Sequence, residues 1–292
     1  MFQKGGRPVG FKKKDGLAGL LFLLPSLAGV LVFVLLPFGD VVRRSFQEAM
    51  SGAFVGLRNY QMVLSNGAFQ LAAGNTLRFM GVCMPLLILL SLLVAVLLHS
   101  RMERAGMLKI TFLLPMAIPV ASVVLLWRAV FHRDGFLSLL AEALGGQRVD
   151  WMNSHWAFWV LVFSYIWKNL GYDMVLWLAG LSGIPSTVYE AAQVDGAGPM
   201  TIFRRITLPG LLPSLYTITV LSFLNSFKVF REAYLVAGDY PHTSMYLLQH
   251  LFNNWFRELS MDKLAAAAVL VAAVILVLIL LLRRAWDEGE EG

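Results

Sequence analysis

Long apolar runs alternate with short polar segments along the 292 residues of the chain. A helix needs about 20 largely apolar residues to cross the hydrocarbon core of a bilayer. Runs of that length lie approximately at residues 17–38, 75–98, 108–130, 156–181, 212–230 and 264–282. Because an open sheet would leave backbone groups unpaired in lipid, the pattern predicts an all-α integral membrane protein with six transmembrane helices.

Basic residues near the ends of these runs predict the orientation of the chain, since Lys and Arg in short loops resist translocation. If the six spans alternate, four clusters face the cytoplasm: Lys12 to Lys14, Arg101 with Arg104 and Lys109, Arg204 with Arg205, and Arg283 with Arg284. Five other arginines would then lie outside, in longer loops where the bias is weaker. We therefore expect a basic cytoplasmic tail over residues 1–16, a membrane domain over 17–282 and a cytoplasmic tail over 283–292.

A basic stretch from Lys4 to Lys14 precedes the first apolar run, as it does in secretory signal peptides. The run is longer than a typical signal core and no small-residue cleavage site closes it, so we expect a retained first span. Several predicted spans contain proline, which frees a backbone carbonyl and favours a kink. These prolines are Pro25, Pro37, Pro85, Pro115 and Pro119.

The composition agrees with lipid as the main solvent. Hydrophobic residues make up 58% of the chain and charged residues 14%, a balance with which a water-soluble domain could hardly cover its surface. The net charge of +6 is spread in short clusters between apolar runs, so we expect no nucleic-acid partner. The single cysteine, Cys83, excludes an intrachain disulfide.

The segment from Ile184 to Pro213, between the fourth and fifth predicted spans, is long for a connection and is patterned as two short helices. Thr187 and Glu190 have the spacing of a capping box for the first helix. Ala191 and Ala192 continue that helix with a small face that another protein can approach closely. The pattern indicates a docking surface.

Glycine and proline divide the two short helices. Gly196 and Gly198 are expected to stop the first helix and permit a tight reversal, and Pro199 suits the first turn of the second. Pro209 is expected to end the second helix just before the fifth span. The sequence thus predicts a helix, a turn and a helix on the cytoplasmic side.

The same segment resembles the EAA motif of ABC importer permeases. The matching residues are Glu190, Ala191, Ala192, Gly196, Ile206, Leu208 and Pro209. The wider stretch EAAQVDGAGPMTIFRRITLPGLLP is similar to the carbohydrate-uptake branch, as are GLRNYQMVL from Gly56, NTLRF from Asn75, FLLPMAIP from Phe112 and WKNLGYDMVLWLAGL from Trp167. The resemblance covers nearly all of the chain. FREAYLVAGDYPH from Phe230 departs from it, since the branch commonly has a Gly-Gly-Pro turn there.

The resemblance implies a type I ABC importer permease fold in the bacterial plasma membrane, with both termini cytoplasmic. It implies that the loop over residues 184–209 couples the chain to an ATPase. The coupling residues would be Glu190, Ala191, Ala192, Asp195, Gly196, Ile206, Leu208 and Pro209. The implied partners are two ABC ATPase copies, a second and different permease chain, an extracytoplasmic solute-binding protein, a sugar-like substrate and the lipid membrane.

The sequence contains no enzyme motif that we can identify. It has no phosphate loop of the form G-x-x-x-x-G-K-[ST], and its five histidines include no H-E-x-x-H pair. We therefore expect a transport subunit that is not an enzyme and binds no cofactor. ATP and Mg²⁺ would be bound by the partner ATPase.

Polar groups at membrane depth mark a water-filled path or an internal pair. The candidates are Lys168, Asn169, Tyr172 and Asp173 in the fourth span and Asn225, Lys228, Arg231 and Glu232 in or after the fifth. Since Lys168 and Asp173 are five residues apart, each is expected to pair with another helix or to snorkel.

Sugars bind planar polar groups and aromatic faces, which favours a substrate path along Trp167, Asn169, Tyr172, Asn225, Lys228, Arg231 and Tyr234. An aromatic belt at the bilayer interface explains the Trp and Tyr residues equally well. An ion-coupled secondary transporter is the alternative function, although it would need carboxylates deep in the spans and often shows inverted repeats. A scaffold without transport would not need the hinged cytoplasmic loop.

Overall fold

The computed structural model describes residues 13–99 and 105–290, and within these ranges it describes all side chains except those of residues 13–21, 105–107, 228, 235–237 and 285–290. The described residues are mainly helical. Their only β pairing is an isolated antiparallel bridge between Gln47 and Phe54. The predicted all-α class is confirmed.

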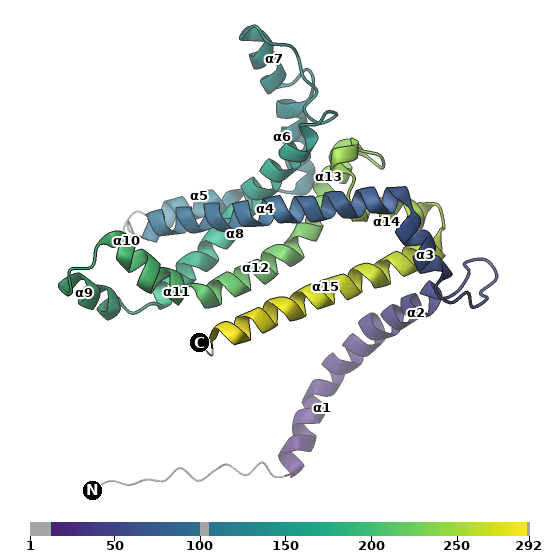
Figure 1. Ribbon diagram of the computed structural model, residues 1–292, viewed down its shortest axis with the longest axis horizontal. Helices are drawn as coiled ribbons and strands as arrows, with labels where there is room; N and C mark the ends of the chain where they lie inside the picture. The colour runs from purple at the N-terminus through teal and green to yellow at the C-terminus, as the bar shows by residue number, and fades with distance from the viewer. Residues whose placement is uncertain (1–12, 100–104, 291–292) are drawn as a thin grey trace. The chain divides into compact units, whose positions relative to one another are not determined.

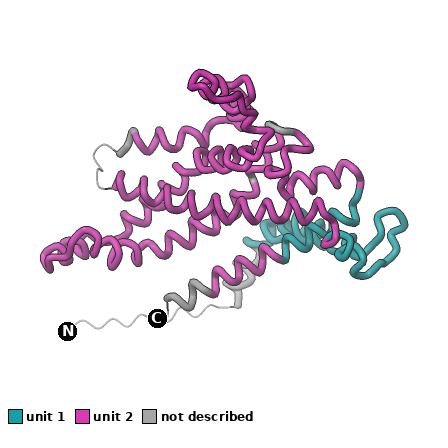
Figure 2. The backbone as a smooth tube through the Cα atoms, turned by 45° about the horizontal axis from the view of Figure 1, so that its top comes forward, with its two compact units in different colours: residues 1–63, 260–273 teal, residues 64–259, 274–292 magenta. Residues whose placement is uncertain are grey.

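The chain divides into two compact units, coloured separately in Figure 2. Unit 1 comprises residues 1–63 and 260–273, and unit 2 comprises residues 64–259 and 274–292. In unit 1, a continuous helix is made of α1 (Lys13–Val30), a π-helical turn (Leu31–Leu35) and α2 (Leu36–Ser45). Pro37 lies in the first turn of α2, and the wider π turn before it provides room where the proline ring would meet the preceding turn. The first helix is therefore longer than the predicted span.

Two helices, α3 (Arg58–Ser65) and α15 (Met261–Glu290), each have residues in both units. Unit 2 is built around α8 (Ala157–Gly183), which packs against α4 (Gly67–His99), α5 (Ala105–Ala117) and α12 (Leu212–Ser226). One core cluster includes Phe79, Phe158 and Tyr165, and another includes Trp177 and Ile218. Buried side chains of α8 contribute to both clusters, so α8 is the central helix of this unit (Figure 1).

Two glycines of α8 allow close approach of its neighbours. A Cβ atom at Gly171 would lie 1.9 Å from the backbone oxygen of Phe112 in α5. At Gly180 it would lie 2.1 Å from the Ser214 hydroxyl oxygen in α12. Small residues at helix contacts let backbones pack closely where both sides are apolar, and these two positions fix α8 against α5 and α12.

The third predicted span is not a single helix, so that part of the prediction is wrong. α5 ends at Ala117 and α6 (Val120–Phe131) begins three residues later. The axis bends by 96° across this break. Pro119 is extended, with ψ of 141°, and starts α6 rather than kinking a continuous helix. A short helix, α7 (Phe136–Ala143), follows α6. Figure 1 shows α6 and α7 running away from α4 and α8.

The connection between α8 and α12 contains α9 (Ser186–Val194), α10 (Pro199–Ile202), a π-helical turn (Phe203–Thr207) and α11 (Leu208–Gly210). After α12 come a 3-10 turn (Phe227–Val229), α13 (Phe230–Ala237), a second 3-10 turn (Thr243–Met245) and α14 (Leu248–Arg257). α14 packs against α4. Within unit 2, Figure 1 shows α9 and α10 beyond one end of α4, and α14 near the other.

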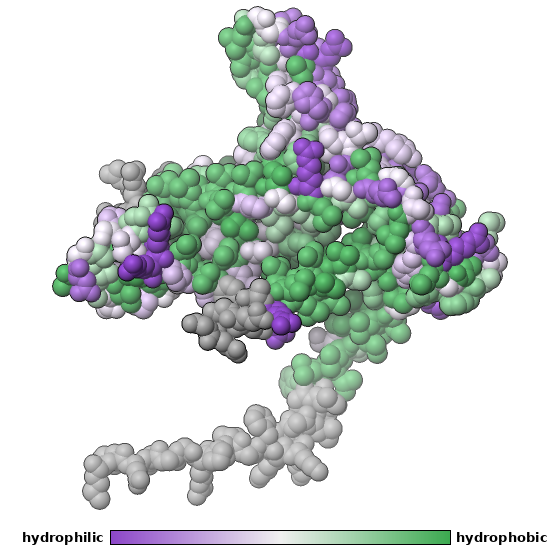
Figure 3. All heavy atoms as spheres, viewed as in Figure 1, coloured by the Kyte–Doolittle hydropathy of each residue, from purple (hydrophilic) through white to green (hydrophobic). Residues whose placement is uncertain are grey.

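Three helices among the described residues are long and apolar enough to cross a membrane: Phe22–Ser45, Gly67–His99 and Met261–Arg284. Two bent pairs, Leu108–Ala117 with Val120–Ala143 and Pro199–Gly210 with Leu212–Tyr234, bring the number up to five. α8 lies outside this set, since polar residues such as Lys168 and Asp173 lower its hydropathy. The count of six spans stays a prediction. Figure 3 shows hydrophobic side chains over the visible flank of α4 and α5, and hydrophilic ones about α9 and α10.

Candidate functional site

The loop between α8 and α12 forms the predicted helical hairpin. Gly196 has φ of +76°, a conformation that costs other L residues energy. Its N–H donates to the Gln193 carbonyl at 3.0 Å, and the Ala197 N–H donates to the Ala192 carbonyl at 2.9 Å. These two bonds make a Schellman motif at the end of α9. Gly198 then precedes Pro199 at the first position of α10. The predicted reversal at Gly196 is confirmed.

Two details of the predicted hairpin are wrong. The N-cap of α9 is Pro185, and no side chain accepts a hydrogen bond there, so Thr187 and Glu190 form no capping box. Pro185 already has the extended backbone that precedes a helix, with ψ of 135°, and Thr187 lies two positions beyond the N-cap, inside the helix, where it cannot cap it. Pro209 does not end the second helix, because it occupies the first turn of α11, where its missing N–H needs no partner. The break comes after Gly210, with a 60° bend.

The hairpin exposes apolar side chains around the EAA residues. Val194 is 88% exposed and Met200 is 62% exposed. Glu190, Ala191, Asp195 and Gly196 are exposed as well, while Ala192 and Ile206 are half-buried. Leu208 and Pro209, further along, are exposed. A small apolar surface with polar edges has the composition of a protein contact.

The base of the hairpin is fixed to the helix bundle. Leu211 is buried in the core cluster that includes Trp177 and Ile218. The Tyr189 hydroxyl in α9 lies 3.2 Å from the Thr207 hydroxyl in the π-helical turn. Packed side chains therefore connect the end of the hairpin to α8 and α12.

A polar cavity of about 140 Å³ lies where α8 meets the segment from α12 to α13. Its polar lining residues are Ser164, Tyr165, Lys168, Asn169, Asn225, Arg231 and Glu232. Met116, Val120 and Val229 supply the apolar part. The cavity brings together polar groups that are far apart in the sequence.

An ion pair joins α8 to α13 at this cavity. The Lys168 ammonium lies 2.5 Å from Oε1 of Glu232, and both side chains are largely buried, at 17% and 9% exposed. The other carboxylate oxygen, Oε2 of Glu232, is buried without a hydrogen-bond partner. A buried pair of this kind is strongly perturbed by loss of one member, since the remaining charge is left unpaired. Lys168 thus pairs with another helix, one of the two arrangements expected from the sequence.

Asp173, one turn beyond the cavity residues of α8, accepts a hydrogen bond from the Ser222 hydroxyl of α12 at 2.7 Å. The Tyr165 hydroxyl donates to the Ser222 carbonyl at 3.1 Å. Asn169 donates to the Tyr165 carbonyl at 2.9 Å, which leaves its amide oxygen at the cavity. These bonds fix the helices that carry the cavity.

The seven predicted pathway residues do not all lie together. Asn169, Asn225 and Arg231 line the cavity. Trp167 instead packs against Trp127, with ring centroids 5.1 Å apart, and Tyr234 packs against Phe230 at 5.3 Å.

Tyr172 is half-buried outside the cavity lining, and the side chain of Lys228 lies outside the described part of the structure. Ser164 and Tyr165 also line the cavity but were not predicted, since isolated Ser and Tyr residues within an apolar run give no signal. Among the described residues, no group of three or more His, Cys, Asp or Glu side chains could hold a metal ion.

The chain is similar in sequence to known proteins. Residues 79–288 match the family model described as the binding-protein-dependent transport system inner membrane component. The trehalose/maltose transport system permease protein MalF of Thermococcus litoralis is 33% identical over 252 residues, 83% of this chain and 85% of that protein. The arabinooligosaccharides transport system permease protein AraP of Bacillus subtilis is 32% identical over 240 residues, 80% and 76% of the two chains.

A similar fold occurs in the crystal structure of a bacterial ABC transporter involved in the import of the acidic polysaccharide alginate. One chain of that transporter superposes with a TM-score of 0.81 at 23% identity, covering 94% of this chain and 96% of its own length. At that identity the likeness shows the fold, which is that of type I importer permeases.

Proposed function

The chain belongs to the family of binding-protein-dependent transport system inner membrane components, and from this premise we propose how it works. It is a membrane-spanning subunit of an ABC importer that takes up a sugar or sugar-like solute from a binding protein. It acts in transport and not as an enzyme. The similar proteins favour this function over the alternative hypothesis, an ion-coupled secondary transporter.

The helical hairpin is the ATPase docking element in this proposal. Two ATPase copies bind ATP and Mg²⁺, and one of them receives α9 of this chain while the other receives a second permease subunit. The exposed apolar residues Val194 and Met200 support the contact. Leu211 supports the transmission, because it links the hairpin to the core beside Trp177. The hairpin and both termini would then lie in the cytoplasm.

The polar cavity is the proposed substrate contact of this subunit. Asn169 and Asn225 each offer both a donor and an acceptor, which suits the hydroxyl groups of a sugar. The ion pair between Lys168 and Glu232 neutralises two charges beside them, so the local field favours a polar solute over a metal cation. Rearrangement of α8 against α13 would open and close this contact as ATP is bound and hydrolysed.

The first experiment is copurification of the chain with the products of its neighbouring genes, with a tag on this subunit. In parallel, Gly196→Asp places an L residue at φ of +76°, which strains the turn. Gly198→Asp is the matched control, because it adds the same charge two residues away at an N-cap position with φ of −71°, where Asp is favourable.

The proposal predicts that an ATPase and a second permease copurify with the parent chain and with the Gly198→Asp variant, whereas the ATPase is lost from the Gly196→Asp variant. If the folded parent chain purifies alone from cells that make those neighbours, the proposed assembly is wrong. If both variants lose the ATPase equally, charge and not the turn controls docking.

A further inference from the structure

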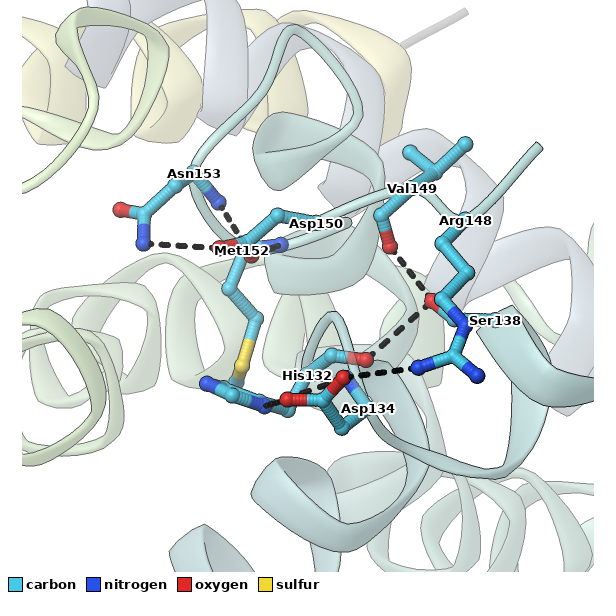
Figure 4. Close-up of polar contacts among 8 residues, drawn as sticks. All are labelled: His132, Asp134, Ser138, Arg148, Val149, Asp150, Met152 and Asn153. Atoms are coloured by element: carbon cyan, nitrogen blue, oxygen red, sulfur yellow. Dashed lines mark hydrogen bonds and ion pairs between the residues drawn. The ribbon is translucent and has the colours of Figure 1, made fainter.

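The segment that follows α6 is held in place by polar contacts, and Figure 4 draws them except that between Arg148 and Glu142. The Arg148 guanidinium donates to Asp134 at 3.1 Å and to Glu142 at 2.8 Å. The Ser138 hydroxyl of α7 is within hydrogen-bond distance of the carbonyl oxygens of His132 and Val149. These contacts hold the segment after α7, which includes Arg148 and Val149, against α7.

Asp150 then fixes the turn that carries Trp151. Its carboxylate accepts hydrogen bonds from the backbone N–H groups of Met152 and Asn153 at 3.2 and 3.1 Å. Such a turn, closed by the side chain of its first residue, holds the next residue in one orientation. The turn therefore fixes the backbone at Trp151, and its indole packs against the core cluster that includes Phe131 of α6 and Val160 of α8.

Beside this turn lies an apolar cavity of about 290 Å³. It is lined by Phe131, Leu137, Trp151, Trp156, Trp159, Val160 and Phe163, so indole N–H groups are the only side-chain hydrogen-bonding groups that it offers. Trp151 and Trp156 contact one another, with ring centroids 5.6 Å apart. Nε1 of Trp151 is buried and has no hydrogen-bond acceptor. A buried donor without an acceptor is costly, which points to a missing partner.

The cavity lies at a border between apolar and charged surface. α6 exposes Leu125 and Leu126, at 67% and 43%, and the exposed charged residues Arg133 and Asp134 follow the end of the helix. Tryptophan is enriched where the hydrocarbon of a bilayer gives way to headgroups. Trp156 and Trp159 are 40% and 47% exposed, so the cavity opens at this level.

We propose that the cavity binds one acyl chain of a membrane phospholipid, whose ester carbonyl accepts the hydrogen bond of the Trp151 indole N–H. An acyl ester has the required combination of an apolar body and one acceptor. A sugar fits poorly, because its hydroxyl groups are donors and the cavity side chains offer no acceptor. The site is separate from the polar cavity at Lys168, with which it shares no lining residue.

The test compares an ester-linked phospholipid with its ether-linked analogue, which has the same chains and headgroup but no carbonyl. Binding to the purified transporter complex is measured by native mass spectrometry after delipidation. One hydrogen bond corresponds to an affinity difference of roughly 2- to 10-fold in favour of the ester. Trp151→Phe keeps the ring and removes the N–H, so it abolishes the preference. Trp156→Phe is the matched control and retains it.

A second pair of variants tests the cavity itself. Leu137→Trp fills it and lowers the binding of both lipids, whereas Leu144→Trp, at a position 80% exposed and outside the lining, leaves both unchanged. Equal binding of ester and ether by the parent complex overturns the proposal. So does an ester preference that survives Trp151→Phe, or lipid binding that Leu137→Trp leaves intact, either of which would assign the lipid elsewhere and leave the cavity to a partner protein.

Discussion

His250 should make the segment around α14 sensitive to acid. The side chain is fully buried, between Phe230 at 4.9 Å and Tyr246 at 5.7 Å between ring centroids. Its Nδ1 accepts the Leu247 N–H at 3.2 Å, so in the neutral ring the proton is on Nε2, which has no partner. Protonation would place a proton on Nδ1 and break the bond to Leu247. The site thus favours the neutral imidazole.

Burial lowers the pKa of His250 from 6.5 to about 4, against a smaller opposing effect of the Asp239 carboxylate. The unfolded segment therefore binds more protons than the folded one between these values, and stability falls as the pH is lowered through this window. Below about pH 4 both states are protonated and the loss is complete. At about 1.4 kcal/mol for each pH unit, the loss amounts to roughly 3–4 kcal/mol, or about a 300-fold larger open population.

Amide hydrogen exchange of α14 measures this opening, with intrinsic exchange rates corrected for pH. Between pH 8 and pH 4 we expect protection of α14 to fall by about 100-fold in the parent chain. His250→Asn keeps an acceptor near Nδ1 but does not titrate, so its protection, although lower at neutral pH, should change much less. His155→Asn, at an exposed position, is the control and should behave like the parent. An unchanged pH dependence in His250→Asn would refute the reasoning.

Three further predictions concern the bundle. Lys168→Met and Glu232→Gln should each abolish uptake and lower the free energy of unfolding by roughly 3–5 kcal/mol, because each leaves a buried charge unpaired. The double variant should recover much of this stability in thermal unfolding, and a double variant less stable than either single one would contradict the pair. Gly171→Ala should lower the free energy of unfolding by about 1–3 kcal/mol or more, as overpacking does, because its Cβ would meet a carbonyl of α5. Gly183→Ala is the control, since its Cβ meets nothing within 4 Å, and it should leave the stability unchanged. Leu211→Ala should cost about 2–5 kcal/mol and reduce sugar uptake more than ATPase copurification, and equal loss of both would argue against transmission through this residue.

The helices themselves were largely predictable, because the length of an apolar run reflects the thickness of the bilayer. α4, α8 and α15 contain their predicted spans almost completely. The reversal at Gly196 was also predictable, since few residues other than glycine tolerate its backbone conformation. The direction of the chain after Pro119 was not predictable, because a proline permits either a kink or a full break in a helix, and the packing of α6 decides between them.

The polar cavity depended on contacts that the sequence does not encode locally. Lys168 and Glu232 are 64 residues apart, and only the packing of α8 beside α13 brings them together. Asn169, Asn225 and Arg231 were identifiable because polar residues at membrane depth are unusual. Trp167, predicted to lie on a substrate path, packs against Trp127 outside the cavity lining, and an aromatic residue in a span has the same sequence pattern whether it faces substrate, lipid or another ring.

The π-helical turn at Phe203–Thr207 sets the rotational register of the hairpin relative to α12. A π turn is equivalent to an α-helix with one residue inserted, and each residue of an α-helix advances by about 100°. Deletion of a single residue within this turn would restore α-helical winding and rotate α9 about the helix axis by roughly that angle. The proposed docking face would keep every residue of its motif and still point in a different direction. If α9 docks to an ATPase as proposed, cysteine cross-linking from Val194 to that ATPase would detect the rotation as a lost product. The π turn would then determine the assembly geometry in a way that a residue-by-residue comparison of the motif does not reveal.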